Sequence, residues 1–233
     1  MTPDDARKAR LAARFVVARL AARFVVAGTV LYAAIDTWLV FARPQFSFLH
    51  NAESDYGSTG PWAWLMDVNF LVRCAIGLAG VVAIVLAVRG AKSGGLGVGT
   101  ALLAVWAVTS GLLAFFPDDP VGTRVHGPGK VHLLLAAVAF VAVAAGAIVT
   151  SHALRSRSRW QWARRPLLAL SWGAIVPVLA LGSVHFARHS LGGLYEKLFL
   201  AAELSWFVVA VAPIALDGFG LERPAPLAKV NGP

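Results

Sequence analysis

Apolar residues follow one another in six long blocks, separated by short breaks that hold charged residues, glycine and proline. The blocks cover these ranges: Ala21–Phe41, Pro61–Val88, Val98–Phe116, Val131–Thr150, Pro166–Phe186 and Leu194–Leu216. A helix that crosses a hydrocarbon core of about 30 Å needs about 20 mostly apolar residues. The pattern therefore predicts an all-α fold, an integral membrane bundle of six transmembrane helices over residues 21–216.

The segment before the first block is basic and contains a repeat. The sequence LAARFVVA occurs at Leu11–Ala18 and again at Leu20–Ala27. A shift of nine residues turns an α-helix by about 180°, so the two copies present opposite faces. We interpret residues 1–20 as an amphipathic basic helix at the membrane surface, and the second copy as the entry into the first span. A cleaved signal peptide is the alternative, although scattered arginines and the lack of a small-x-small site argue against it.

Composition and charge support a membrane protein. Of the 233 residues, 58% are hydrophobic and 14% are charged, whereas about a quarter of a soluble domain is charged. The net charge of +9 comes from short Lys and Arg clusters between apolar blocks. This distribution predicts membrane lipids as partners and no nucleic acid. The single cysteine, Cys74, excludes a disulfide framework and a Cys-rich zinc site.

The basic clusters also predict an orientation. They lie before the first block, after the second and after the fourth, while the alternate connections are poorer in Lys and Arg. Because cytoplasmic loops retain basic residues, we expect a multi-pass protein of the plasma membrane with both termini in the cytoplasm. Residues 217–233 would form a cytoplasmic tail.

Carboxylates inside the blocks are the strongest candidates for chemistry. Asp36, Asp67 and Glu203 lie in the first, second and sixth blocks, each roughly 8–14 Å from the outer end at about 1.5 Å per residue. Ionisable residues at membrane depth are costly and usually have partners or a function. Arg73 can pair with one of these acids as a structural ion pair. Three acids against one arginine leave surplus negative charge, so at least one carboxyl is a proton donor or a ligand for a positive group.

We expect Asp36, Asp67 and Glu203 to face one cavity as catalytic residues. Further polar and aromatic residues are predicted to bind substrate in it: Tyr32, Phe70, Arg73, Trp106, Ser110 and Trp206. Charged residues near the outer ends of the blocks are predicted to form its outer rim: Glu53, Asp55, Asp118, His132, His185, Glu196 and Lys197.

His185 and His189 are four residues apart, the spacing that lets two imidazoles on one helix face bind one metal ion. A complete site needs further ligands from His132, Asp55 or Asp118. We expect no cofactor, and a metal at this pair is the alternative.

Several short motifs resemble a known family. They are Ser54-Asp55-Tyr56-Gly57, Phe116-Pro117-Asp118-Asp119, His132 at the start of the fourth block, and Gly193-Leu194-Tyr195-Glu196-Lys197 leading to Trp206. Over about residues 22–215 the chain resembles the bacterial and archaeal membrane proteins of the domain of unknown function 998 family. The resemblance implies a polytopic membrane fold and carries no settled activity.

Three functions fit these features. The first is an enzyme that handles a hydrophobic substrate, an isoprenoid or another lipid, by carboxylate acid/base chemistry, similar in site design to membrane terpene cyclases and isomerases. The second is a non-enzymatic accessory protein or a proton-coupled transporter. The third is a metal-dependent membrane lipid hydrolase.

Overall fold

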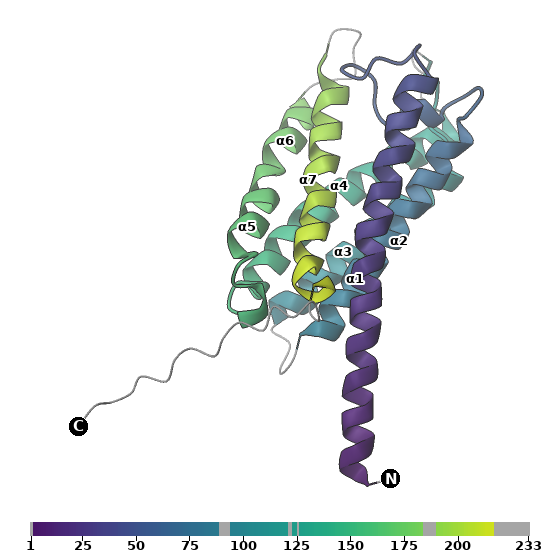
Figure 1. The fold of residues 1–233 in the computed structure, drawn as a ribbon. Helices are drawn as coiled ribbons and strands as arrows, with labels where there is room; N and C mark the ends of the chain where they lie inside the picture. The colour runs from purple at the N-terminus through teal and green to yellow at the C-terminus, as the bar shows by residue number, and fades with distance from the viewer. Residues whose placement is uncertain (1, 89–93, 121–122, 125, 184–189, 217–233) are drawn as a thin grey trace.

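The computed structural model describes residues 2–88, 94–120, 123–124, 126–183 and 190–216. These residues form helices and no strand, and six helical segments are long and apolar enough to cross a membrane. The predicted all-α bundle is therefore confirmed. The helices, drawn in Figure 1, have these bounds: α1 Pro3–Ala42, α2 Trp64–Ala87, α3 Gly94–Leu112, α4 Gly127–Leu154, α5 Arg164–Gly173, α6 Ile175–Ser183 and α7 Gly192–Ala215.

Helix α1 joins the basic N-terminal segment and the first span in one continuous rod. Thr2 and Asp5 form a capping box at its start, and Pro44 follows directly after the C-cap residue Arg43. No break marks residue 20, and the N-terminal part of α1 extends beyond the other helices (Figure 1). The buried residues of α1 recur every three, four or seven positions and begin at Ala18, so the part of α1 from Ala18 onward contributes to the core.

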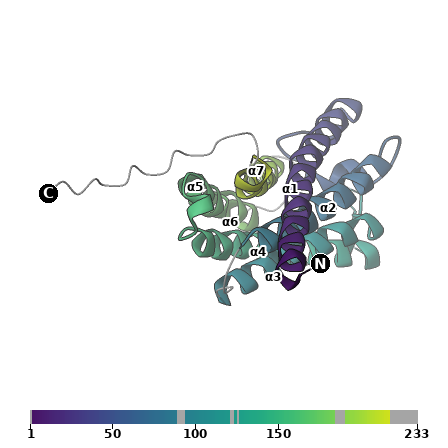
Figure 2. The same ribbon diagram turned by 60° about the horizontal axis from the view of Figure 1, so that its bottom comes forward.

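The fifth span consists of two helices, α5 and α6, which meet at Ala174. Pro177 explains the break, because proline has no N–H to donate to the carbonyl of Gly173, four residues earlier, and its ring clashes with that carbonyl. Viewed after a 60° turn, α7 has α5 and α6 on one side and α1 on the other (Figure 2).

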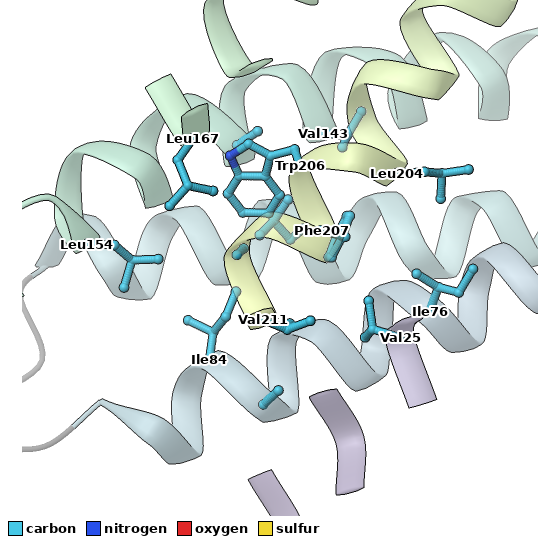
Figure 3. Close-up of a cluster of buried hydrophobic side chains, with 14 of the residues drawn as sticks. Val25, Ile76, Ile84, Val143, Leu154, Leu167, Leu204, Trp206, Phe207 and Val211 are labelled. Atoms are coloured by element: carbon cyan, nitrogen blue, oxygen red, sulfur yellow. The ribbon is translucent and has the colours of Figure 1, made fainter. Parts of the chain in front are cut away.

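An aromatic layer lies at the centre of the bundle. Trp106 of α3 and Trp206 and Phe207 of α7 form it, and Gly77 of α2 packs against it. Trp106 stacks on Phe207 with ring centroids 4.9 Å apart, and Trp206 meets Phe207 edge-on at 5.2 Å. A Cβ on Gly77 would lie only 2.6 Å from the Trp106 ring, so the glycine allows α2 and α3 to approach closely. Aliphatic residues from several helices surround Trp206 and Phe207 (Figure 3).

Arg14 connects α1 to the C-terminal end of α2. Arg14 of α1 donates to the carbonyls of Leu86 and Val85 at 2.9 and 3.0 Å, which satisfies the C-terminus of α2.

Exposed tryptophans gather at both ends of the bundle: Trp38, Trp62 and Trp64 at one, Trp162 and Trp172 at the other. Tryptophan is enriched at both interfaces of a membrane, so their positions agree with a transmembrane bundle.

Close packing of α3 on α4 gives a stability prediction. Gly99 is buried, and a Cβ there would lie 2.9 Å from the Thr150 backbone nitrogen. Gly97, two residues away, has nothing within 4 Å of a Cβ. We expect Gly99→Ala to lower the free energy of unfolding by about 1–3 kcal/mol through overpacking. The control Gly97→Ala should be neutral or slightly stabilising, because alanine favours helix. Thermal unfolding in detergent compares the two, and equal shifts would contradict this packing.

Candidate functional site

The connection between α1 and α2 folds over the end of the bundle at which α7 begins (Figure 1). It contains a short 3-10 helix, η1, at Ser54–Gly57. Arg43 holds this connection, because its guanidinium donates to the backbone carbonyls of Tyr56 and Thr59. The Arg43 side chain is buried, so these bonds fix the loop from inside rather than at its surface.

The same loop docks onto the start of α7. The Leu194 amide donates to the Leu49 carbonyl at 3.1 Å, and Lys197 Nζ donates to the Asn51 carbonyl at 3.0 Å. A Cβ on Gly193 would collide with the Asn51 backbone, so glycine is required where the loop crosses the helix. The Gly193–Lys197 motif thus explains how the loop is held against α7.

Glu53 is the centre of a buried polar network beneath this loop. Its carboxylate accepts a hydrogen bond from the Tyr32 hydroxyl and forms an ion pair with Arg73, with Oε2 3.3 Å from Nη1. Its backbone N–H donates to Oε2 of Glu196 at 3.0 Å. The network joins α1, α2, α7 and the loop. Because both charged side chains of the pair are almost fully buried, the ion pair is held in a low dielectric.

Unpartnered polar atoms lie one helical turn from the aromatic layer, toward the loop. Arg73 precedes Gly77 by four residues, Ser110 follows Trp106 by four, and Glu203 precedes Phe207 by four, so the three share one level. Both Glu203 carboxyl oxygens, the Ser110 hydroxyl and Arg73 Nε are buried without a hydrogen-bond partner among the described residues.

A cavity of about 750 Å³ opens beside this network. Its lining divides into two parts. Polar side chains come from the loop, from residues 118–119 and from the starts of α4 and α7: Ser54, Asp55, Asp118, Asp119, His132 and Glu196, with Arg73 of α2. Apolar side chains come mainly from the next turns of α4 and from α6: Leu133, Ala136, Ala137, Phe140 and Leu181. Leu133 is 50% exposed on the helix surface, so the apolar part reaches the side of the bundle that would face lipid.

His132 is held in one tautomer at the cavity wall. Its Nδ1 lies 2.7 Å from the Phe116 carbonyl oxygen, which can only accept a hydrogen bond. Nδ1 therefore carries the proton in the neutral ring, and Nε2 has a free lone pair. The ring also meets Phe70 edge-on at 5.9 Å and interacts electrostatically with Asp67. These contacts orient a potential base toward the cavity.

The two aspartates near His132 are also positioned. Asp55 Oδ2 accepts hydrogen bonds from Asn51 Nδ2 and the Ala52 amide, both at 2.9 Å. Burial raises the pKa of the Asp55 carboxyl, an effect that the hydrogen bond from Asn51 opposes. Asp118 accepts from the Ser54 hydroxyl at 2.8 Å. The motif residues thus bring one carboxyl with a raised pKa and one tethered carboxylate to the same cavity.

Of the predicted catalytic acids, the structure brings two together. Asp36 and Glu203 both interact electrostatically with Glu53 and Arg73. Asp67 lies on another side of α2, near His132, as its angular distance from Arg73 on the helix would suggest. None of the three lines the cavity, so their catalytic role stays a prediction.

The other predicted site residues also divide into those that line the cavity and those that do not. Phe70 and Arg73 line the cavity, whereas Tyr32 does not line it and donates a hydrogen bond to Glu53. Trp106, Ser110 and Trp206 are packed in the core. Of the predicted rim, Asp55, Asp118, His132 and Glu196 line the cavity, while Lys197 and Glu53 form the contacts behind it.

Sequence reasoning missed Arg43, Asn51, Phe140 and Leu181. Arg43 lies directly between the first apolar block and Pro44, and an arginine in this position is a candidate anchor for the loop that follows. His185 and His189 lie outside the described residues, as does the predicted tail. Among the described residues, no group of three or more His, Cys, Asp or Glu side chains is placed to hold a metal ion.

The fold and the cavity define a polytopic helical membrane protein with an amphiphilic cavity at one end. The chain belongs to the family described as protein of unknown function (DUF998), whose model matches residues 26–213. The predicted family resemblance is therefore confirmed. Neither the curated proteins nor the solved structures that were compared gave a match.

Proposed function

We propose that the protein is an integral membrane enzyme that binds a lipid-like substrate in this cavity and acts on its polar end by acid/base chemistry. The observation that carries the proposal is the division of one cavity into a carboxylate- and imidazole-lined part and an apolar part that opens at the side of α4. A lipid entering from the bilayer would place its chain along α4 and its head against the loop. Ligand cavities typically combine apolar walls with a few convergent polar groups.

His132 and Asp55 have complementary properties for proton transfer. The free Nε2 of His132 accepts a proton as general base. The raised pKa of the Asp55 carboxyl favours its protonated form relative to an exposed aspartate, so it donates a proton as general acid. The sequence-based candidates act differently in this account: Asp67 supports His132 electrostatically, and Asp36 and Glu203 belong to the network around Arg73.

One observation favours the second candidate, a proton-coupled or accessory function. The buried oxygens of Glu203 and one oxygen of Asp36 have no hydrogen-bond partner among the residues described. Intramembrane acids of this kind form proton relays in pumps and transporters. This alternative places the functional proton at Glu203 rather than at the cavity lining.

Lipid bound after purification tests the enzyme proposal. Protein extracted in mild detergent should retain a lipid that mass spectrometry identifies. Ala137 lines the cavity where it opens, so Ala137→Trp should fill the entrance and abolish retention. The adjacent exposed residue Val138 does not line the cavity, so Val138→Trp is the matched control and should retain the lipid. Equal retention by both variants would contradict binding in this cavity.

We further propose the orientation that the basic clusters predict: the cavity end faces outward, and both termini lie on the cytoplasmic side of the plasma membrane. Thr59 and Ser156 are exposed at the two ends of the bundle. In a Cys74→Ser background, cysteine at Thr59 should react with an impermeant thiol reagent in intact cells, and cysteine at Ser156 should react only after lysis. The reverse pattern would place the cavity at the cytoplasmic face.

A further inference from the structure

Polar side chains of α2, α3 and α7 face a common junction in the core of the bundle. Trp106 of α3 stacks on Phe207 of α7 and packs against Gly77 of α2, so these residues mark where the three helices meet. A residue four positions along an α-helix lies on the same face. The residues four positions nearer the loop therefore face the same junction: Arg73, Ser110 and Glu203. The electrostatic interaction between Arg73 and Glu203 agrees with this placement.

The junction holds buried oxygen atoms that the described part of the chain leaves without a partner. Both carboxyl oxygens of Glu203 and the hydroxyl of Ser110 are shielded from solvent and make no hydrogen bond there. The same is true of the amide oxygen of Asn69, which lies on the Arg73 face of α2, one turn nearer the loop. Exposed fractions are 3% for Glu203 and 0% for Ser110 and Asn69. Buried polar groups normally have a partner, so these oxygens indicate an occupant.

The charge of Glu203 indicates what kind of occupant fits. Two neighbouring carboxylates have a cation of their own, because Arg73 forms an ion pair with Glu53 and Lys197 interacts with Glu196. Glu203 interacts with Arg73 as well, but also with Glu53 and Glu196, which add negative charge. One further positive charge therefore balances the ionised Glu203 in this low-dielectric region.

We infer that a small monovalent cation, sodium, binds at this junction between Glu203, Ser110 and Asn69. Hard cations take carboxylate, amide and water oxygens as ligands. A proton on Glu203 would supply a single donor, whereas a cation contacts all of these oxygens at once. A water molecule bound with the ion accepts from the unpartnered N–H groups of Arg73 Nε and Asn69 Nδ2.

The sodium site is separate from the lipid cavity. Arg73 lines that cavity, but Asn69, Ser110 and Glu203 do not. The inference therefore goes beyond the proposed function and does not rest on it. The ion would join three spans, α2, α3 and α7, directly behind the cavity wall.

Sodium-dependent stability tests the site. The full-length protein in detergent is heated in sodium, potassium or choline chloride at equal concentration and pH. A ligand that binds only the folded protein raises its stability as the ligand concentration increases. We expect sodium to raise the unfolding temperature by several degrees over choline, in a saturable way, and potassium to have little effect. Equal unfolding temperatures in sodium and choline, or an equal rise in potassium, would overturn the inference.

Paired variants locate the ion. Glu203→Gln and Ser110→Ala should each abolish the sodium-dependent rise. Asp67→Asn, on another side of α2, and Thr109→Ala, whose hydroxyl donates to the Val105 carbonyl of its own helix, should retain it. Ser110→Ala leaves every charge in place, so it keeps the test valid when Glu203→Gln fails to fold. A rise that persists in the variants of Glu203 and Ser110, or that is lost in either control, would overturn this location.

Discussion

Replacing Arg73 by methionine is expected to lower the free energy of unfolding by about 3–5 kcal/mol, the usual loss when one partner of a buried ion pair is removed. The substitution leaves the Glu53 carboxylate without its ion-pair partner, in a site where the side chain is almost fully buried. Glu203 would also lose the positive charge that interacts with it. An uncompensated carboxylate in this network should therefore destabilise the whole loop end.

A second substitution separates charge from packing. Glu53→Gln keeps an acceptor for Tyr32 and removes the charge, so Glu53→Gln combined with Arg73→Met should recover a large part of the lost stability. Lys8→Met provides the control, since Lys8 pairs with Asp4 on an exposed surface and its loss should shift the unfolding temperature little. Thermal unfolding of the wild-type protein, Arg73→Met, Glu53→Gln and the double variant gives the coupling energy between the two residues. Additive losses in the double variant would contradict a structural ion pair.

Substituting His132 by glutamine is expected to reduce turnover of the bound lipid by about 10²–10⁴-fold, the usual contribution of a general base. The glutamine amide keeps a donor for the Phe116 carbonyl but has no basic nitrogen at neutral pH. The fold should be retained, because the contact with the carbonyl is preserved. The assay follows consumption of the lipid identified by co-purification, with unfolding temperature measured alongside.

Other outcomes of this assay assign the chemistry elsewhere. Loss of turnover in Asp36→Asn or Glu203→Gln, with His132→Gln active, would restore the intramembrane acids as catalysts. Inactivation by a chelator, together with loss in His185→Ala or His189→Ala, would indicate a metal hydrolase. If these variants change only the stability of the protein or the recovery of a partner protein, an accessory function replaces the proposed enzymatic function.

The fold was predictable because the membrane forces a simple pattern on the sequence. Five of the six predicted spans both begin and end within a few residues of the observed helices, as Pro61–Val88 does for α2. The first span differs, because nothing between residues 3 and 42 breaks a helix and α1 therefore continues through the basic segment. Pro177 was visible as an interruption, and it divides the fifth span.

The site was predictable only in part, because depth along a helix does not give direction or describe how loops fold. Glu53 lies outside the apolar blocks and was placed at the rim, yet the loop turns it inward onto Arg73. Trp106 and Trp206 have the composition of a binding pocket but fill the core, since helix crossings decide which aromatic residues face each other. His132 and Asp118 were expected near span ends, and the structure places both in the lining of one cavity.

A density map of the full-length protein in a lipid nanodisc tests the central claim most directly. The account predicts elongated density between α4 and α6, with its chain along Phe140 and Leu181 and its head among Asp55, Asp118 and His132. Density that instead surrounds Glu203 and Asn69, or a cavity that side chains close completely in the membrane, would contradict the claim that this end of the bundle binds a lipid.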